Sequence, residues 1–326
     1  MVSPPFALRG LQHRLNLTFA AKISSMKSTI QSSLSRYSHI FALVVLVCLQ
    51  GCSTIKLGYN NAPSLAYWWL DDYVDFDATQ SKQVRDELER LHQWHRATEL
   101  PKIEALLQRA QIMVASDVTP AQACVMLADT RARIAAATNQ TVSGVALVAA
   151  TISPAQRQHI ARKFEKSNAT WQEDWNEGTV EERQAKRLKA AVENAEQLYD
   201  SLNEKQTALL RELDAASGYD PNISFKERLR RQKDLLQTLA RINPANAADK
   251  PDPAQASIYI QEYLARNASS PDPVYRAFAE KMYAESCNAF AIVHNSTTAK
   301  QRERAIKRIA AYARDARDLM ALKDIK

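Results

Sequence analysis

The sequence predicts an all-α protein, an elongated bundle of antiparallel helices. Glycine is scarce: the 326-residue chain has six glycines, and only four of them follow position 51. Alanine, leucine, glutamate, arginine and glutamine dominate, and these residues favour helices. Apolar residues recur at intervals of three or four, as at Leu188, Ala191 and Ala195, rather than alternating as they would in a strand.

Three helix starts are clearly marked, because each combines a capping side chain, a proline and a glutamine three residues after the cap. They are Thr119–Gln122, Ser153–Gln156 and Asp252–Gln255. The proline loses nothing at the first helical position, and the glutamine reaches back to the cap N–H. Looser versions occur at Asp77–Gln80, Asn203–Gln206 and Thr298–Gln301, and versions with glutamate at Thr179–Glu182 and Ser224–Glu227.

The spacing and the interruptions of this pattern predict how the helices are organised. The six glutamine-containing starts lie 42, 34, 50, 49 and 46 residues apart, which is the length of a helix pair. The side chains between them do not repeat, so we predict no solenoid. Pro101 should break or kink the helix that begins near Asp77. Residues 243–253 are the least regular segment and mark a loop or a boundary between two lobes.

The positive charge of the chain belongs to its N-terminal segment. Residues 1–51 contain five basic residues and no acidic ones, and the rest has 38 basic against 36 acidic residues. Sequence-independent DNA binding needs a dense basic face, so we expect no nucleic-acid partner.

The N-terminal segment has the features of a signal peptide. The apolar run Ile40–Leu49 follows Arg36 and spans ten residues, whereas a transmembrane helix needs about 20. Leu49-Gln50-Gly51-Cys52 resembles the lipobox of bacterial lipoprotein signal peptides, although Gln50 departs from the usual small residue. The resemblance implies cleavage after residue 51 and lipid attachment to Cys52 through diacylglycerol, with a further acyl chain on the new amino group. An ordinary signal peptide or a buried apolar segment is the alternative.

This interpretation sets the domain boundaries. Residues 1–51 are the expected signal peptide, with Met26 as the expected start, residues 52–60 a lipidated tether, and residues 61–326 a helical periplasmic domain. In lipoproteins of this kind, an aspartate directly after the lipidated cysteine implies retention in the inner membrane. This chain has Ser53 at that position, so the resemblance implies sorting to the outer membrane. The expected partners are the lipid bilayer, through acylated Cys52, and an envelope protein.

Two cysteines remain for the folded domain. Cys124 and Cys287 form an even pair in an oxidising compartment, which favours a disulfide over two buried free thiols. Neither cysteine has the basic surroundings of a catalytic thiol.

One pair of histidines could bind a metal. His92 and His95 lie one helical turn apart, with Glu89 and Glu99 at helical spacing. His95 also lies on an apolar stripe, and no HExxH motif accompanies the pair, so core packing is favoured. We expect no metal and no cofactor, with His92 and His95 as weak candidates for a metal-dependent enzyme. The glycines are too few for a phosphate-binding loop.

An aromatic cluster follows the expected anchor. Six aromatic residues lie within 18 positions: Tyr59, Tyr67, Trp68, Trp69, Tyr73 and Phe76. They suit a membrane interface or a core layer. Core packing is favoured, because interleaved aspartates would be repelled by an anionic surface. The basic runs Arg228–Lys233 and Lys300–Arg308 are interpreted as solvated faces rather than lipid-binding sites.

Several segments resemble an uncharacterised family of proteobacterial lipoproteins. They are "YNNAPSLAYWWLDDYVDFDATQ" from Tyr59, "FEKSNATWQEDW" from Phe164, "RLKAAVENAEQLYDSL" from Arg187 and "HNSTTAKQRERA" from His294. The resemblance implies a helical periplasmic lipoprotein and carries no catalytic residue. We therefore expect a non-enzymatic interaction or envelope-maintenance module. A periplasmic chaperone-like holdase is the alternative, because the Ser/Thr-Pro-x-Gln segments are similar to the Leu-Thr-x-x-Gln motifs of periplasmic stress-response proteins.

Overall fold

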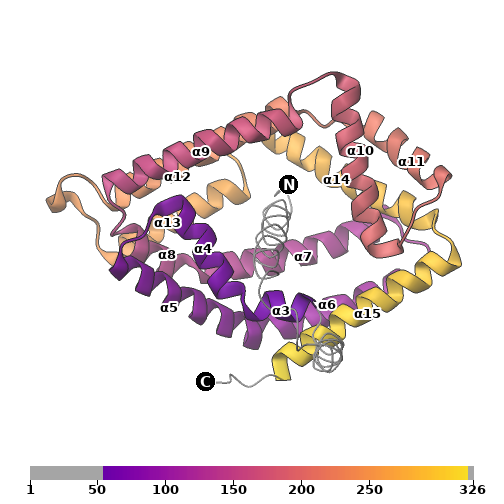
Figure 1. The fold of residues 1–326 in the computed structure, drawn as a ribbon, viewed down its shortest axis with the longest axis horizontal. Helices are drawn as coiled ribbons and strands as arrows, with labels where there is room; N and C mark the ends of the chain where they lie inside the picture. The colour runs from indigo at the N-terminus through magenta and orange to yellow at the C-terminus, as the bar shows by residue number, and fades with distance from the viewer. Residues whose placement is uncertain (1–53, 322–326) are drawn as a thin grey trace, which may run out of the picture. The chain divides into compact units, whose positions relative to one another are not determined.

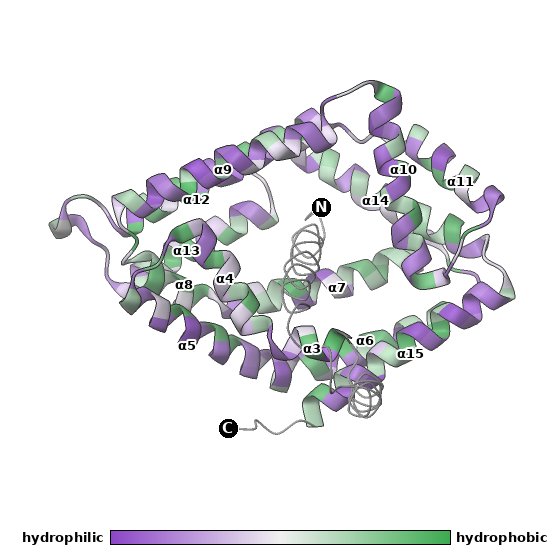
Figure 2. Ribbon diagram, in the orientation of Figure 1, coloured by the Kyte–Doolittle hydropathy of each residue, from purple (hydrophilic) through white to green (hydrophobic). Residues whose placement is uncertain are grey.

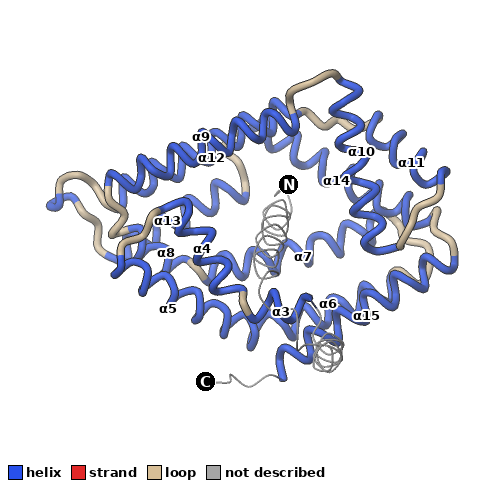
Figure 3. The backbone as a smooth tube through the Cα atoms, in the orientation of Figure 1, coloured by secondary structure: helices blue, strands red, loops and turns tan. Residues whose placement is uncertain are grey.

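The computed structural model describes residues 54–321, and this part of the chain consists of helices and loops with no β-strand (Figure 3). The predicted all-α fold is confirmed. The chain divides into two compact units, Met1–Tyr59 and Asn60–Lys326. The described part of the first unit lies in helix α3 (Thr54–Asn60), whose last residue is the first of the second unit, and the remaining helices belong to the second unit. Cys52 lies outside the described residues, and residues 243–253 lie inside the second unit.

The helices of the second unit fall into two sets of six (Figure 1). The first set is α4 (Ala62–Val74), α5 (Ala78–Trp94), α6 (Leu100–Met113), α7 (Pro120–Gln140), α8 (Val142–Ala149) and α9 (Pro154–Trp175), with a π-helical turn η1 (His95–Glu99) before α6. The second set is α10 (Val180–Tyr199), α11 (Glu204–Ala215), α12 (Pro221–Ile242), α13 (Pro253–Ala268), α14 (Pro273–Asn295) and α15 (Ala299–Ala321), with a 3-10 turn η2 (Ala247–Asp249) before α13.

Most predicted helix starts are confirmed. Reciprocal capping boxes begin five helices at the expected residues: Asp77–Gln80, Thr119–Gln122, Ser153–Gln156, Thr179–Glu182 and Asn203–Gln206. Asp252 caps the N–H of Gln255, and Thr298 and Gln301 exchange the same two bonds at the start of α15. Each start depends on hydrogen bonds that span three residues, so the local sequence is sufficient to place it.

One predicted start is wrong. Helix α12 begins at Pro221, where the side chain of Asp220 accepts the N–H of Asn222, and not at Ser224. Glu227 therefore does not belong to a capping box. It is buried, and it accepts hydrogen bonds from Arg230 and Arg231 at 2.7 Å. A polar residue three positions before a glutamate does not distinguish a cap from an ion-paired site inside a helix.

Pro101 interrupts the α-helical pattern as predicted. It lies in the first turn of α6, directly after the π-helical turn η1. Proline has no N–H to donate to the preceding turn, and the wider π-turn accommodates this loss without ending the helical path.

The two sets of helices make matching contacts. In the first set, α4 packs on α9 and α5 packs on α8. In the second set, α10 packs on α15 and α11 packs on α14. In the same way α6 packs on α15 and α7 on α14, while α12 packs on α9 and α13 on α8. The helices α4–α9 therefore correspond one by one to α10–α15. This is a correspondence of two halves rather than a solenoid, and it is not evident from the sequence.

A pair of glutamines bridges the hairpins in each half, at equivalent positions. The side-chain amide of Gln80 donates to the carbonyl of Thr151 at 3.0 Å, and that of Gln156 donates to the carbonyl of Asp75 at 2.9 Å. The two amides also bond each other, with Gln156 Nε2 donating to Gln80 Oε1 at 2.6 Å. In each case the acceptor carbonyl lies five residues before the partner glutamine.

The second half repeats this geometry. Gln206 donates to the carbonyl of Ser296 at 3.1 Å, and Gln301 to the carbonyl of Ser201 at 2.9 Å. The two amides again exchange hydrogen bonds, at 2.8 and 2.9 Å. The glutamines that cap their own helices thus also join two hairpins that are far apart in sequence.

Apolar side chains fill the spaces between these hairpins. Figure 2 shows hydrophobic residues at intervals among hydrophilic ones along the helices, as expected for helices with one buried side. One buried cluster, which includes Ile152, Ile160 and Ile242, joins α8, α9, α12 and α13. A second, which includes Val114 and Ile309, joins α6, α10 and α15.

Candidate functional site

Tyr67 ties helix α4 to the core. Its side chain is 6% exposed, and its hydroxyl donates to Ser81 Oγ on α5 at 2.9 Å. The guanidinium of Arg85 lies 3.5 Å from the centre of the ring, and the ring of Phe76 lies 6.3 Å away. The prediction that the aromatic cluster packs in the core is correct for this residue.

The next two residues of α4 do not pack in the core. Trp68 is 61% exposed and Trp69 is 49% exposed, so core packing is wrong for these two side chains. Only one side of a helix can face its neighbours, and Tyr67 occupies that side here. The ring of Trp69 contacts Tyr73 at 5.1 Å, and Tyr73 in turn lies 6.1 Å from Phe164 on α9.

The aspartates around these aromatic residues are engaged within the protein. Asp71 Oδ1 accepts the N–H of Phe76 at 3.1 Å, and Asp77 caps α5. Asp72 forms an ion pair with Lys163 on α9 at 2.6 Å. The charge of Asp72 is balanced locally, which weakens the argument that these aspartates repel an anionic surface.

A shallow groove runs between α9 and α12. Its volume is about 460 Å³, and its lining includes the apolar side chains of Phe164, Leu229 and Leu236 beside the polar Gln232 and Lys233. Phe164 joins this groove to the aromatic contacts of α4. A groove of this kind can accept apolar side chains of another molecule, with polar groups at its edge to orient them.

The proposed metal ligands are not assembled into a site. Glu99 is 1% exposed and is held by Lys102 at 2.7 Å and Arg133 at 3.2 Å. The hydrogen bond from Lys102 lowers the pKa of the Glu99 carboxyl, and burial lowers the pKa of His95. Within residues 54–321, no group of three or more histidine, cysteine, aspartate or glutamate side chains is arranged to hold a metal ion. His92 and His95 therefore lack a third ligand in this part of the chain.

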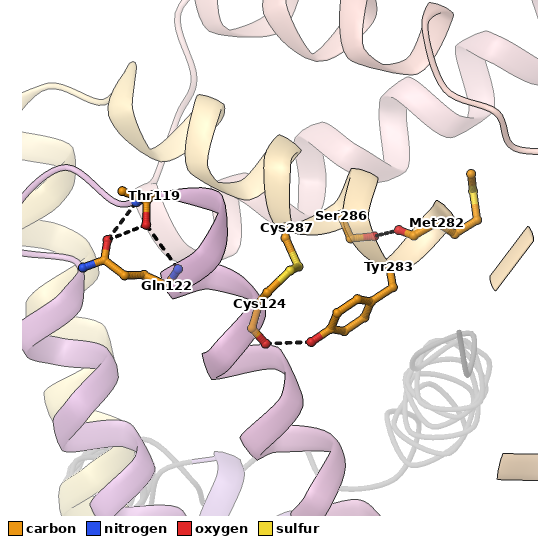
Figure 4. Close-up of a disulfide and its surroundings, with 7 residues drawn as sticks. All are labelled: Thr119, Gln122, Cys124, Met282, Tyr283, Ser286 and Cys287. Carbon is orange, nitrogen blue, oxygen red and sulfur yellow. Dashed lines mark hydrogen bonds between the residues drawn. A yellow bond between two sulfur atoms is a disulfide. The ribbon is translucent and has the colours of Figure 1, made fainter. Parts of the chain in front are cut away.

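Cys124 of α7 and Cys287 of α14 form a disulfide, which fits the pairing favoured by the cysteine count (Figure 4). Their Cα atoms lie 5.2 Å apart, and the hydroxyl of Tyr283 donates to the carbonyl of Cys124 at 2.7 Å. Both sulfur atoms are bonded, so neither is available as a nucleophile in this state.

Among the histidines of residues 54–321, His294 is the most buried. Its side chain has no exposed surface. Nδ1 lies 2.9 Å from the hydroxyl of Tyr199, and Nε2 lies 2.9 Å from the carbonyl of Ser116. Since the carbonyl can only accept, Nε2 carries the hydrogen and Nδ1 accepts from the tyrosine. The ring stacks on Phe290, and burial lowers the pKa of the imidazole.

This burial predicts a loss of stability in mild acid. The ordinary pKa of 6.5 applies to His294 in the unfolded chain, while its pKa in the folded protein is lower. Below pH about 6.5 the unfolded state therefore binds more protons, and the free energy of unfolding should fall as the pH decreases. Urea denaturation between about pH 7 and about pH 5 measures this slope. The variant His294→Gln should have a shallower slope, because the contribution of His95 is common to both proteins. Equal slopes for wild type and His294→Gln would show that His294 is not the source of the pH dependence.

The two basic runs form ion pairs within the protein. Arg230 and Arg231 both bind Glu227, and Lys307 pairs with Glu303 at 2.5 Å. Arg302 pairs with Asp117, which links α15 to the loop before α7. These pairings agree with faces balanced by the protein's own carboxylates.

Comparison with known proteins gives one match. The model of a family described as "Family of unknown function (DUF6279)" matches residues 72–251, which is just over half of the chain. No curated protein and no solved structure matches. The matched segment runs from the end of α4 through α12 and includes both sides of the groove. No helix within residues 54–321 is both long enough and apolar enough to cross a membrane.

Proposed function

The chain belongs to DUF6279, a family of unknown function, and on that premise we propose that it is a lipid-anchored interaction module on the periplasmic face of the outer membrane. The observation that carries this proposal is Cys52, which follows a charged segment, a ten-residue apolar run and Gly51 in the order of a lipoprotein signal. Acylation at two positions would provide durable attachment, since a single chain binds a membrane only marginally.

The disulfide supports an oxidising compartment for the helical domain. Disulfides persist in the periplasm and are rare in the bacterial cytosol. Cys124 and Cys287 are the two cysteines that remain after Cys52, and both are used in one bond. The pairing is consistent with export of the folded domain.

The groove between α9 and α12 supports binding as the activity of the module. It combines exposed apolar surface, as at Leu229, with a polar edge at Gln232 and Lys233. A partner could bury apolar side chains against Leu229 and Leu236 while it bonds the edge. We propose a non-enzymatic role in maintaining the envelope, with a protein of the envelope as the partner.

Replacing Cys52 tests the anchor. In the variant Cys52→Ser the thioether cannot form, so the protein should leave the membrane fraction and lose the mass of its acyl groups. The matched control is Cys48→Ser, four residues upstream in the apolar run, which should leave anchoring unchanged. Membrane fractionation and intact-mass measurement give the result. If the Cys52→Ser protein sediments with membranes as wild type does, the anchor proposal is wrong.

Crosslinking in cells tests the interaction of the groove with an envelope protein. A photo-crosslinking residue at Leu229 should capture one defined envelope protein from cells, and Cys52→Ser should reduce its yield. The same residue at Val180, which is exposed on α10 and outside the groove, serves as the control position. Equal capture at the two positions would show that the groove is not the binding site.

A further inference from the structure

Exposed apolar side chains are concentrated next to the expected anchor. Fourteen large apolar side chains are exposed within residues 55–321, and four of these lie between residues 55 and 69. They are Ile55, Leu57, Trp68 and Trp69. Single exposed apolar residues are ordinary on a protein surface, but this density in one short segment, with two adjacent tryptophans, requires a separate explanation.

The equivalent helix in the other half shows that the fold does not require these tryptophans. Helices α4 and α10 end in the same way: the N–H of Asp75 bonds the carbonyl of Asp71, and the N–H of Asp200 bonds the carbonyl of Glu196. The carboxylates of Asp71 and Glu196 also each accept an N–H from the following loop.

This alignment of the helix ends fixes the equivalent positions. Glu193 and Asn194 of α10 occupy the places of Trp68 and Trp69. The same helical position is thus built with a charged and an amide side chain in one half and with two tryptophans in the other. The tryptophans are therefore best explained by a contact outside the folded domain.

The chain length brings Trp68 close to the membrane. Cys52 and Trp68 are sixteen residues apart, and most of these residues lie in α3 and α4. With a rise of 1.5 Å per helical residue and at most about 3.5 Å elsewhere, the path between them is at most about 32 Å. An indole side chain combines an apolar ring with an N–H donor, which suits the interface between acyl chains and head groups.

We infer that Trp68 and Trp69 insert into the interfacial region of the bilayer that holds the lipid of Cys52, and that this contact orients α4 and the helical domain on the membrane. The inference rests on the proposed function, because the anchor supplies the proximity. The ion pair of Asp72 with Lys163 and the hydrogen bond accepted by Asp71 reduce the electrostatic penalty of bringing these carboxylates to the surface.

Quenching by brominated lipids tests the inference. The full-length mature protein, with acylation verified by intact mass, is reconstituted into phosphatidylethanolamine–phosphatidylglycerol vesicles with brominated acyl chains, which quench tryptophans at the bilayer. Wild-type fluorescence should be quenched relative to that in unbrominated vesicles. The double variant Trp68→Phe and Trp69→Phe should lose this quenching. The matched double variant Trp171→Phe and Trp175→Phe, on α9, should keep it.

The outcomes separate the inference from the anchor. If acylated, vesicle-bound wild type shows no quenching, the inference is overturned and the anchor stays intact. The same holds if the double variant Trp68→Phe and Trp69→Phe is quenched as strongly as wild type. Wild type without acyl groups would contradict the proposed function itself.

A second variant tests the comparison of the halves. Trp68→Glu with Trp69→Asn copies α10 and should retain the circular-dichroism spectrum and melting temperature of wild type. A loss of helix content would show that the tryptophans serve the fold, and would also overturn the inference.

Discussion

Reduction of the disulfide between Cys124 and Cys287 is expected to lower the free energy of unfolding by up to about 5 kcal/mol. The two cysteines are 163 residues apart, so the bond closes a long loop and removes much conformational freedom from the unfolded chain. The bond also joins α7 to α14. The equivalent helices, α13 and α8, pack on each other without a covalent link.

Denaturation with and without reductant measures this effect. The reduced protein keeps both sulfur atoms, so the comparison isolates the covalent bond from the loss of side-chain volume. The double variant Cys124→Ala and Cys287→Ala is the control, and reductant should not change its unfolding curve. Coincident curves for oxidised and reduced wild type, or alkylation of both cysteines without reductant, would disprove the stabilising bond.

Replacing Gln206 by alanine is expected to destabilise the protein by about 2–4 kcal/mol. The amide of Gln206 is 2% exposed, and it bonds the carbonyl of Ser296, the N–H of Asn203 and the amide of Gln301. The substitution removes one or more hydrogen bonds from each of these partners, although Gln301 keeps its bonds to Ser201 and Thr298. The cost of each buried group left unsatisfied is about 1–3 kcal/mol. Some of this cost is recovered, because water reaches the partly exposed partners.

The matched control for this substitution is Gln122→Ala. Gln122 forms the same capping box with Thr119, and it is exposed and has no hydrogen bond to a second glutamine in the described residues. Its loss should cost about 1 kcal/mol, the value of a cap alone. The difference between the two variants, measured by urea denaturation, gives the contribution of the bridge between hairpins. Equal costs would show that Gln206 acts only as a cap.

The sequence specified the local features of the fold. Thr119, Ser153 and Asn203 start their helices where the residue pattern placed them, because a capping box needs only groups three residues apart. The failure at Ser224 has the same origin: Asp220, followed by proline, competes for the cap, and the pattern of Ser224 and Glu227 does not exclude it.

The candidate site was predicted less completely. The position of the aromatic cluster was evident from the sequence, but its division into a buried Tyr67 and exposed Trp68 and Trp69 was not. All three residues are large and aromatic, and only the place where α5 packs on α4 selects the one that is buried. The burial of His294 was missed for the same reason, since its partners Tyr199 and Ser116 are distant in sequence. The lipid on Cys52 stays a prediction.

The sequence by itself therefore determined the all-α class, most helix starts and the availability of Cys124 and Cys287 as a pair. The tertiary structure decided which glutamines meet, since Gln80 and Gln156 are 76 residues apart and Gln206 and Gln301 are 95 apart. It also showed that two halves with little repetition of side chains make the same contacts. The physical reason is range: caps and turns are fixed by neighbouring groups, whereas burial and amide pairing depend on which helix faces are brought together by packing.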